Sequence, residues 1–215
     1  MEFQQVLKKR HSVRDFSEKP IAKDLLIEII KEAQTAPSWV NSQPWKVYIA
    51  TGESLRAIKT AYKENIAADK PRHPDFSPLP REQWAAFPQK NMAATSASIG
   101  QAFGENITTF NEAQVNLFNA QAIAYLTIPK DSPNWSIHDL GAFSQTLMLS
   151  AADKGIGSIN AFALVLFPDD VRKILDIPHD QIIPIAIALG YSRDTLLGNY
   201  TSKRLPVEDI LIIKD

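Results

Sequence analysis

Two almost uninterrupted apolar segments restrict the fold of this chain more than any other feature of its sequence. They cover residues 122–128 and 182–189, where Thr127 is the one polar aliphatic side chain. Runs of this length and composition are typical of strands that are buried on both faces. Residues 158–165 predict a further strand, and residues 46–50 predict another. We therefore expect an α+β fold with a mixed or antiparallel central sheet that helices cover on each side.

Helices are predicted between these strands by apolar residues at helical spacing. The expected helices cover residues 3–10, a segment after Pro20, residues 54–69, 89–119 and 136–154, and a short segment after Pro168. The helix over residues 136–154 is apolar on more than one face, which is typical of a central helix. In the first helix we expect Phe3, Val6 and Leu7 to share one face.

Two segments fall outside this pattern. Residues 70–88 carry five of the 14 prolines, which excludes a central strand there and leaves either a lid or an extended surface connection. The tail alternates through Val207, Ile210 and Ile212, which predicts a terminal strand that needs a sheet edge, and a partner chain can supply that edge.

No internal repeat or linker divides the sequence, so we expect one domain over residues 1–215.

The composition excludes several classes of function. The 23 Lys and Arg residues nearly balance the 24 Asp and Glu residues, so no broad positive surface is available for nucleic acid. The absence of cysteine excludes disulfides, thiolate nucleophiles and cysteine metal sites, and the four histidines lack metal-ligand spacing. No signal-like start and no apolar run of ~20 residues is present, so we expect a soluble, cytoplasmic protein without a membrane partner.

The usual motifs for nucleotide binding and nucleophilic catalysis are also missing. Residues 155–157 lack the third glycine of a dinucleotide loop and precede a strand, and no GxSxG motif occurs. His138 and Asp139 are neighbours, which point to different sides of a helix, so we expect Asp139 to cap the helix start. With no protein-supplied catalytic residue, the sequence favours chemistry carried by a bound cofactor.

Three polar segments remain as candidates for a site. Residues 10–14 place two arginines, a histidine and a serine together, which suits a phosphate monoester, although such clusters are also common on solvated surfaces. Residues 37–45 place uncharged hydrogen-bonding side chains beside two tryptophans, which suits a flat heterocycle. The alternative for that segment is a rigid turn whose tryptophans fill the core, and we expect this of Trp45. Lys203 and Arg204 add two cations before the tail.

Together, these segments resemble the nitroreductase family of FMN-dependent oxidoreductases over almost the whole chain, and lie nearest to its nitrobenzoate-reductase-like branch. The family opens with R-[RH]-S-[VIT]-[RK]-x-[FY], which here spans residues 10–16. It continues with A-P-S-x-x-N-x-Q-P-W, which spans residues 36–45, and ends with an arginine before Leu-Pro, here Arg204. Residues 139–158 resemble the central helix of the family and its exit.

The resemblance implies an α+β sandwich that forms an intertwined homodimer with C-terminal strand exchange and two interfacial FMN molecules. The residues that match the family's cofactor positions in one chain are Arg10, His11, Ser12 and Arg204 for the phosphate and ribityl chain, and Arg14 for the pyrimidine side. Pro37, Ser38 and Asn41 would come from the partner chain. A cation near the pyrimidine stabilises the negative charge of the reduced flavin.

One segment departs from the family pattern. The backbone of Asn160, Ala161 and Phe162 would face the flavin between its dimethylbenzene edge and N5, where many relatives have a Pro-x-Glu-Gly-type segment. A main-chain N–H can still be supplied there, whereas the side-chain roles are not carried over. Residues 70–88 and 103–118 would border the substrate channel.

The activity that the resemblance implies is hydride transfer from NADH or NADPH through flavin N5 to a nitroaromatic, quinone-like or other small, planar, electron-poor acceptor. Both substrates would use one site in turn, which implies ping-pong kinetics. Two alternatives stay open from the sequence. One is a member of the family with different flavin chemistry, such as reductive dehalogenation or flavin cleavage. The other is a non-catalytic flavin-binding protein.

Overall fold

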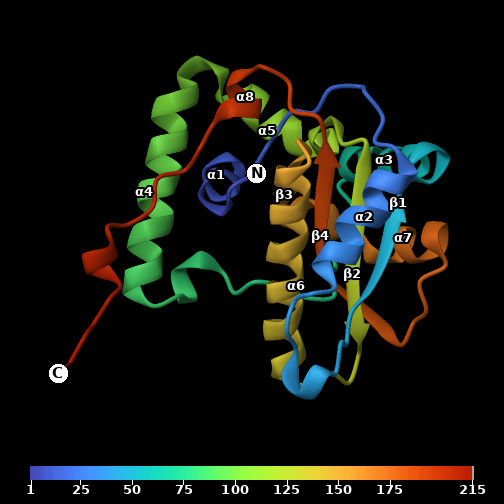
Figure 1. Ribbon diagram of the computed structural model, residues 1–215. Coiled ribbons are helices and arrows are strands. Elements are labelled where there is room, and N and C mark those ends of the chain that lie inside the picture. Colours follow the sequence, from blue (N-terminus) through green and yellow to red (C-terminus); the bar gives the residue numbers. More distant parts are fainter. Residues whose placement is uncertain (215) are drawn as a thin grey trace.

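The computed structural model describes residues 1–214 and has a four-stranded antiparallel sheet at its centre (Figure 1). The order of its strands is β1-β2-β4-β3, with β1 at Lys46–Ala50, β2 at Ala122–Pro129, β3 at Gly157–Asn160 and β4 at Gln181–Gly190. The helices are α1 (Phe3–Lys9), α2 (Lys23–Ala33), α3 (Gly52–Ala67), α4 (Ala86–Phe103), α5 (Ile107–Val115), α6 (Asn134–Asp153), α7 (Pro168–Leu175) and α8 (Leu196–Asn199). The predicted α+β class, antiparallel sheet and helical segments are confirmed, except that the helical region predicted over residues 89–119 is divided by a 3₁₀ turn at Gly104–Asn106 into α4 and α5.

Helices cover both faces of the sheet because its central strands alternate between two apolar cores. On β2, Ala124 and Leu126 pack in the core shared with α2 and α6, whereas Ile123 and Tyr125 face the core shared with α3 and α7. Trp45 belongs to the first core and lies 4.8 Å from the ring of Phe143, so its predicted role as a core residue is confirmed. This packing explains why the strand segments are apolar at successive positions.

The predicted strand at residues 158–165 is wrong in its second half. β3 ends at Asn160, and a short 3₁₀ helix follows over Phe162–Val165. Ala163, Leu164 and Val165 are buried in this helical turn. The apolar run at residues 161–165 is compatible with either a strand or a buried helical turn, because both bury consecutive side chains.

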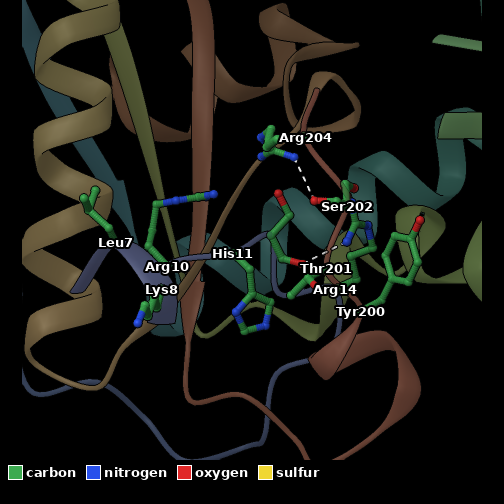
Figure 2. Close-up of a pocket in the computed structure, with 10 residues that line it drawn as sticks. Leu7, Lys8, Arg10, His11, Arg14, Tyr200, Thr201, Ser202 and Arg204 are labelled. Carbon is green, nitrogen blue, oxygen red and sulfur yellow. Dashed lines mark hydrogen bonds between the residues drawn. The ribbon is translucent and has the colours of Figure 1, made fainter. Parts of the chain in front are cut away.

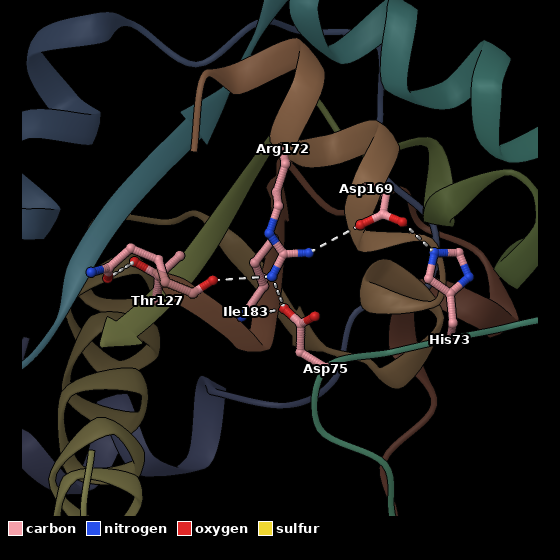
Figure 3. A network of polar contacts seen from close by, with 7 residues as sticks. His73, Asp75, Thr127, Asp169, Arg172 and Ile183 are labelled. Atoms are coloured by element: carbon pink, nitrogen blue, oxygen red, sulfur yellow. Dashed lines mark hydrogen bonds and ion pairs between the residues drawn. The ribbon is translucent and has the colours of Figure 1, made fainter. Parts of the chain in front are cut away.

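The proline-rich segment before α4 is held to the body by an ion-pair network centred on the buried Arg172 (Figure 3). Arg172 of α7 pairs with Asp75, donates a 3.0 Å hydrogen bond to the carbonyl of Gln181 and approaches Asp169 at 3.4 Å. Asp75 also accepts a 2.8 Å hydrogen bond from the backbone N–H of Ile183 in β4. The segment is thus an extended connection without a strand, as its prolines predict, and Asp75 anchors it to the edge of the core.

α4 and the C-terminal segment stand apart from the sheet and lie side by side (Figure 1). Val207, Ile210 and Ile212 expose 55%, 66% and 82% of their surface. Apart from the 3₁₀ turn Val207–Asp209, residues 201–214 form no regular element in the single chain. The strand that the alternating pattern predicts is therefore absent here, and pairing with a partner chain stays a prediction. On α1, only Val6 of the three residues expected to share a face is buried.

A close approach at Gly190 attaches the N-terminal segment to the sheet. A Cβ atom at Gly190 would lie 2.8 Å from the ring of Phe16, which is fully buried. The backbone N–H of Val13 donates a 3.0 Å hydrogen bond to the carbonyl of Ser158 in β3. Residues 10–16 are consequently held against the end of β3, and this determines where their polar side chains point.

Candidate functional site

A pocket of about 260 Å³ opens where the end of α1 meets the segment after α8 (Figure 2). The structure brings together here five of the residues singled out in the sequence: Arg10, His11, Ser12, Arg14 and Arg204. Lys8, Tyr200, Thr201 and Ser202 also line it. Residues almost 200 positions apart thus share one cavity, because α8 and the chain after it return to the N-terminal loop.

The pocket has a strong excess of positive charge. Arg10, Arg14, Arg204 and Lys8 line it, and no acidic side chain does within residues 1–214. Burial lowers the pKa of Arg10, and the positive charge of Arg204 lowers it further. Two guanidinium groups that repel each other, beside hydroxyl groups, provide the donor set that a phosphate monoester requires.

His11 is placed differently from the arginines. Its Nδ1 lies 2.8 Å from the carbonyl oxygen of Lys9, and its Nε2 lies 2.7 Å from that of Gly198. Both nitrogens can donate at once only when the ring carries a proton on each. In this position the imidazole links the N-terminal loop to α8, so its contribution to the pocket is to bring the two segments together.

Residues 160–162 continue from the pocket along β3. Ser158 forms a bridge with Ser12, and Asn160 lies two residues further along the same strand, about 7 Å away at the usual rise of a strand. Beyond it, Phe162 is 46% exposed and borders a groove of about 240 Å³ together with Phe76. A planar group that starts at the pocket can therefore follow β3 towards residues 160–162 within one chain.

The loop with Pro37, Ser38 and Asn41 lies elsewhere. It is held at the start of α6, where Asp139 accepts a 3.0 Å hydrogen bond from the backbone N–H of Trp39. Residues at the other end of α6, such as Ala152, lie beside Arg10. At about 1.5 Å per residue, these two positions on α6 are about 20 Å apart. The structure therefore does not bring the two predicted halves of the site together within one chain.

The same loop is strained. Val40, Asn41 and Gln43 have φ angles of +49°, +55° and +43°. A β-branched residue such as Val40 rarely adopts this left-handed conformation, and strain of this kind is concentrated at functional sites. The hydroxyl group of Ser38 accepts a 3.0 Å hydrogen bond from the backbone N–H of Gln43 and supports the turn. The loop is thus shaped by internal contacts and by α6.

Asp139 corrects two of our expectations. It does not cap its own helix. Asp139 is only 3% exposed, and its carboxylate instead holds the loop through the backbone N–H of Trp39. Its neighbour His138 also contacts it, with 3.4 Å between Nδ1 and Oδ1, although adjacent residues were expected to diverge. The contact between Asp139 and Trp39 joins residues 100 positions apart, so no local sequence signal indicates it.

Within residues 1–214, no group of three or more His, Cys, Asp or Glu side chains is placed to hold a metal ion. None of the helices in this part of the chain combines the length and apolar character that crossing a membrane requires.

Comparison with known proteins gives consistent matches along the chain. The sequence model of the Nitroreductase family matches residues 7–191. A 4-nitrobenzoate reductase from Pseudomonas putida is 28% identical over 96% of this chain and 92% of its own length. A nitrobenzene nitroreductase from Ectopseudomonas oleovorans is 27% identical over 92% of this chain and 89% of its length. The crystal structure of the FMN-dependent nitroreductase NfnB from Mycobacterium smegmatis, in complex with NADPH, shares the fold with a TM-score of 0.89, at 23% identity over 99% of this chain and 97% of that one.

Proposed function

The chain belongs to the nitroreductase family, and we propose that it is an FMN-dependent oxidoreductase that uses NADH or NADPH to reduce nitroaromatic compounds. The named activities of its relatives support the nitroaromatic acceptor. Quinone-like and other planar, electron-poor acceptors belong to the same proposal, because the groove beside Phe76 and Phe162 offers apolar side chains to any flat ring. The observation that carries the proposal is the cationic pocket of Arg10, Arg14 and Arg204.

That pocket fits the phosphate end of FMN. Arg10 and Arg204 carry like charges at one pocket; burial and this repulsion both lower the pKa of Arg10, and an anion between the two groups relieves the repulsion. Ser12 and Ser202 provide neutral donors at the same place. From there the ring system would extend along β3, which Ser12 contacts through Ser158, to the backbone of residues 160–162.

When bound, FMN supplies the hydride-transfer chemistry, and the protein supplies binding, orientation and charge. Arg10 and Arg204 hold the phosphate, and Arg14 places a positive charge beside the ring. The exposed backbone after Asn160 is available to donate to the ring edge. No side chain in this arrangement acts as an obligatory acid or base. The two substrates bind in turn beside the same residues, so we expect ping-pong kinetics.

A complete site requires a second copy of the chain. Because the loop of Ser38 and Asn41 lies about 20 Å along α6 from the Arg10 pocket, it contacts a flavin in that pocket only if a partner supplies it. We therefore propose a homodimer in which Pro37, Ser38 and Asn41 of one protomer approach the FMN held by Arg10 of the other.

The tail has a matching place on such a partner. Among the described residues, β1 pairs with β2 alone, which leaves its outer edge free. Beside that edge lies a groove of about 580 Å³ with apolar side chains from α2 and β1, including Ile27, Ile30 and Val47. The exposed Ile210 and Ile212 are suited to this groove, since a strand added at an edge satisfies the free backbone groups of both segments. We propose that the tail of each protomer adds to β1 of its partner.

Deleting residues 207–215 is expected to weaken the dimer and FMN binding together. The deletion removes the strand proposed to cover the partner's β1, and the loop with Ser38 and Asn41 then dissociates from the neighbouring pocket. Sedimentation velocity combined with the flavin absorbance of the sedimenting species measures both effects. A truncated monomer that remains saturated with FMN would contradict the two-chain site.

The function itself is tested by the visible spectrum. The purified protein is expected to contain FMN, to lose its flavin absorbance on anaerobic addition of NADH or NADPH, and to regain it on addition of 4-nitrobenzoate or nitrobenzene. Recovery of intact FMN separates this activity from flavin cleavage. A flavin that neither nicotinamide bleaches would instead indicate a non-catalytic binding protein, and FAD in place of FMN would exclude the phosphate assignment.

A further inference from the structure

Arg14 is held in an unusual way for a half-buried cation. Its guanidinium carbon lies 5.5 Å from the ring centre of Phe110 in α5 and 5.5 Å from the ring centre of Tyr200, which follows α8. Figure 2 shows Tyr200 beside Arg14 at the edge of the pocket. The only hydrogen bond from its side chain within residues 1–214 goes to the carbonyl oxygen of Ser12, at 2.9 Å. Two aromatic faces thus determine where the charge lies.

Both rings are themselves supported by α4. Phe103, at the end of that helix and 3% exposed, lies 5.0 Å from Phe110 and 5.4 Å from Tyr200. The hydroxyl group of Tyr200 lies 3.2 Å from that of Ser98 in the same helix. The aromatic clamp, by which we mean Phe110 and Tyr200, is therefore a packed unit and not a chance contact on the surface.

An aromatic clamp differs from a salt bridge because it leaves the charge and the N–H donors of the arginine available to a ligand. Arg172 is neutralised by Asp75, whereas no carboxylate of residues 1–214 pairs with Arg14. A ring face attracts a cation without accepting its N–H groups in the guanidinium plane. Burial lowers the pKa of Arg14, and within residues 1–214 its side chain donates one hydrogen bond and faces no carboxylate partner. The guanidinium group of Arg14 can therefore interact with negative charge on a ligand.

We propose that Phe110 and Tyr200 are positioning residues that set the reduction potential of the bound flavin through Arg14. The inference rests on the proposed FMN site and adds two residues that the sequence motifs do not include. With the rings in place, Arg14 stays beside the pyrimidine side of the flavin, where reduction places negative charge, and favours the reduced form. Without a ring, the side chain turns away and that preference falls.

The test is potentiometry on the purified dimer at matched FMN saturation. Tyr200→Leu is expected to reduce the preference for reduced over oxidised FMN about tenfold, which lowers the midpoint potential by about 30 mV for a two-electron couple. Phe110→Leu is expected to act in the same direction. Tyr200→Phe keeps the ring and loses only the contact with Ser98, so its potential should stay near that of the parent. Thermal unfolding identifies variants that do not fold.

The double variant Arg14→Ala/Tyr200→Leu decides whether the clamp acts through Arg14. Its potential should equal that of Arg14→Ala, since the ring has no cation left to position. Tyr191→Leu is the matched control, because it removes a ring that faces Lys19 at 4.1 Å outside the pocket, and it should leave the potential unchanged. The clamp proposal would be wrong if Tyr200→Leu shifted the midpoint potential equally in the parent and in the Arg14→Ala background. It would also be wrong if Tyr200→Leu bound FMN without any shift. Neither result would affect the proposed function. A parent protein without FMN would overturn the proposed function as well.

Discussion

Replacing Arg10 by alanine is expected to weaken FMN binding about ten- to a hundredfold. The guanidinium group lines the cationic pocket, and a hydrogen bond to a charged partner contributes roughly 1.5–3 kcal/mol. Titration of the apoprotein with FMN, followed by flavin fluorescence, gives the dissociation constants.

Two comparisons make this result specific. Arg56→Ala removes the same charge from α3, where the side chain is 71% exposed and pairs only with Glu53, and it should leave FMN affinity unchanged. Arg14→Ala should weaken FMN binding less than Arg10→Ala but lower the flavin potential and slow hydride acceptance. If Arg10→Ala shifted the potential while Arg14→Ala left it untouched, the roles assigned to these two arginines would be wrong.

Replacing Arg172 by leucine is expected to lower the free energy of unfolding by about 3–5 kcal/mol. The change leaves Asp75 buried without its ionic partner, and an unpaired buried charge costs roughly this much. The carboxylate would retain only the N–H of Ile183, so the segment before α4 should detach as well. Urea denaturation followed by circular dichroism measures the loss.

A double-mutant cycle separates the ion pair from simple packing. Arg172→Leu/Asp75→Leu removes both charges, so it should be clearly more stable than the sum of the single losses predicts. Lys173→Ala, on the exposed face of the same helix, should change stability by less than about 0.5 kcal/mol. Additive losses in the cycle would show that Arg172 and Asp75 do not stabilise each other.

Much of the fold could be predicted because it depends on local patterns. β2 and β4 are buried on both faces, so their apolar runs identify them without knowledge of their neighbours. α6 lies between the core and the loop of residues 38–41, and its two apolar faces indicate a central position. The boundary at Asn160 could not be predicted, because the residues of the 3₁₀ turn that follows are as apolar as a strand.

Composition and spacing alone predict the candidate site only where its residues are close in sequence, whereas Arg204 is assigned through the resemblance to the family. Arg10, Ser12 and Arg14 lie in one segment, and their grouping is visible before folding. The roles of Tyr200 and Asp139 depend on contacts between distant segments, which composition and spacing do not reveal. The tail illustrates the same limit, since its alternation indicates a strand, but residues 201–214 form none in the single chain and pairing with a partner stays a proposal.

The two-chain site is tested most directly by complementation between two defective variants. One carries Arg10→Ala, which damages the pocket, and the other carries Ser38→Ala and Asn41→Ala, which damage the loop. Differently tagged copies are coexpressed, and the mixed dimer is isolated and its FMN content measured. If each site takes its pocket from one protomer and its loop from the other, the mixed dimer has one intact site and should retain about one FMN per dimer at full affinity. A mixed dimer that binds FMN no better than either parent variant would show that pocket and loop serve the same flavin within one chain, and would contradict the account.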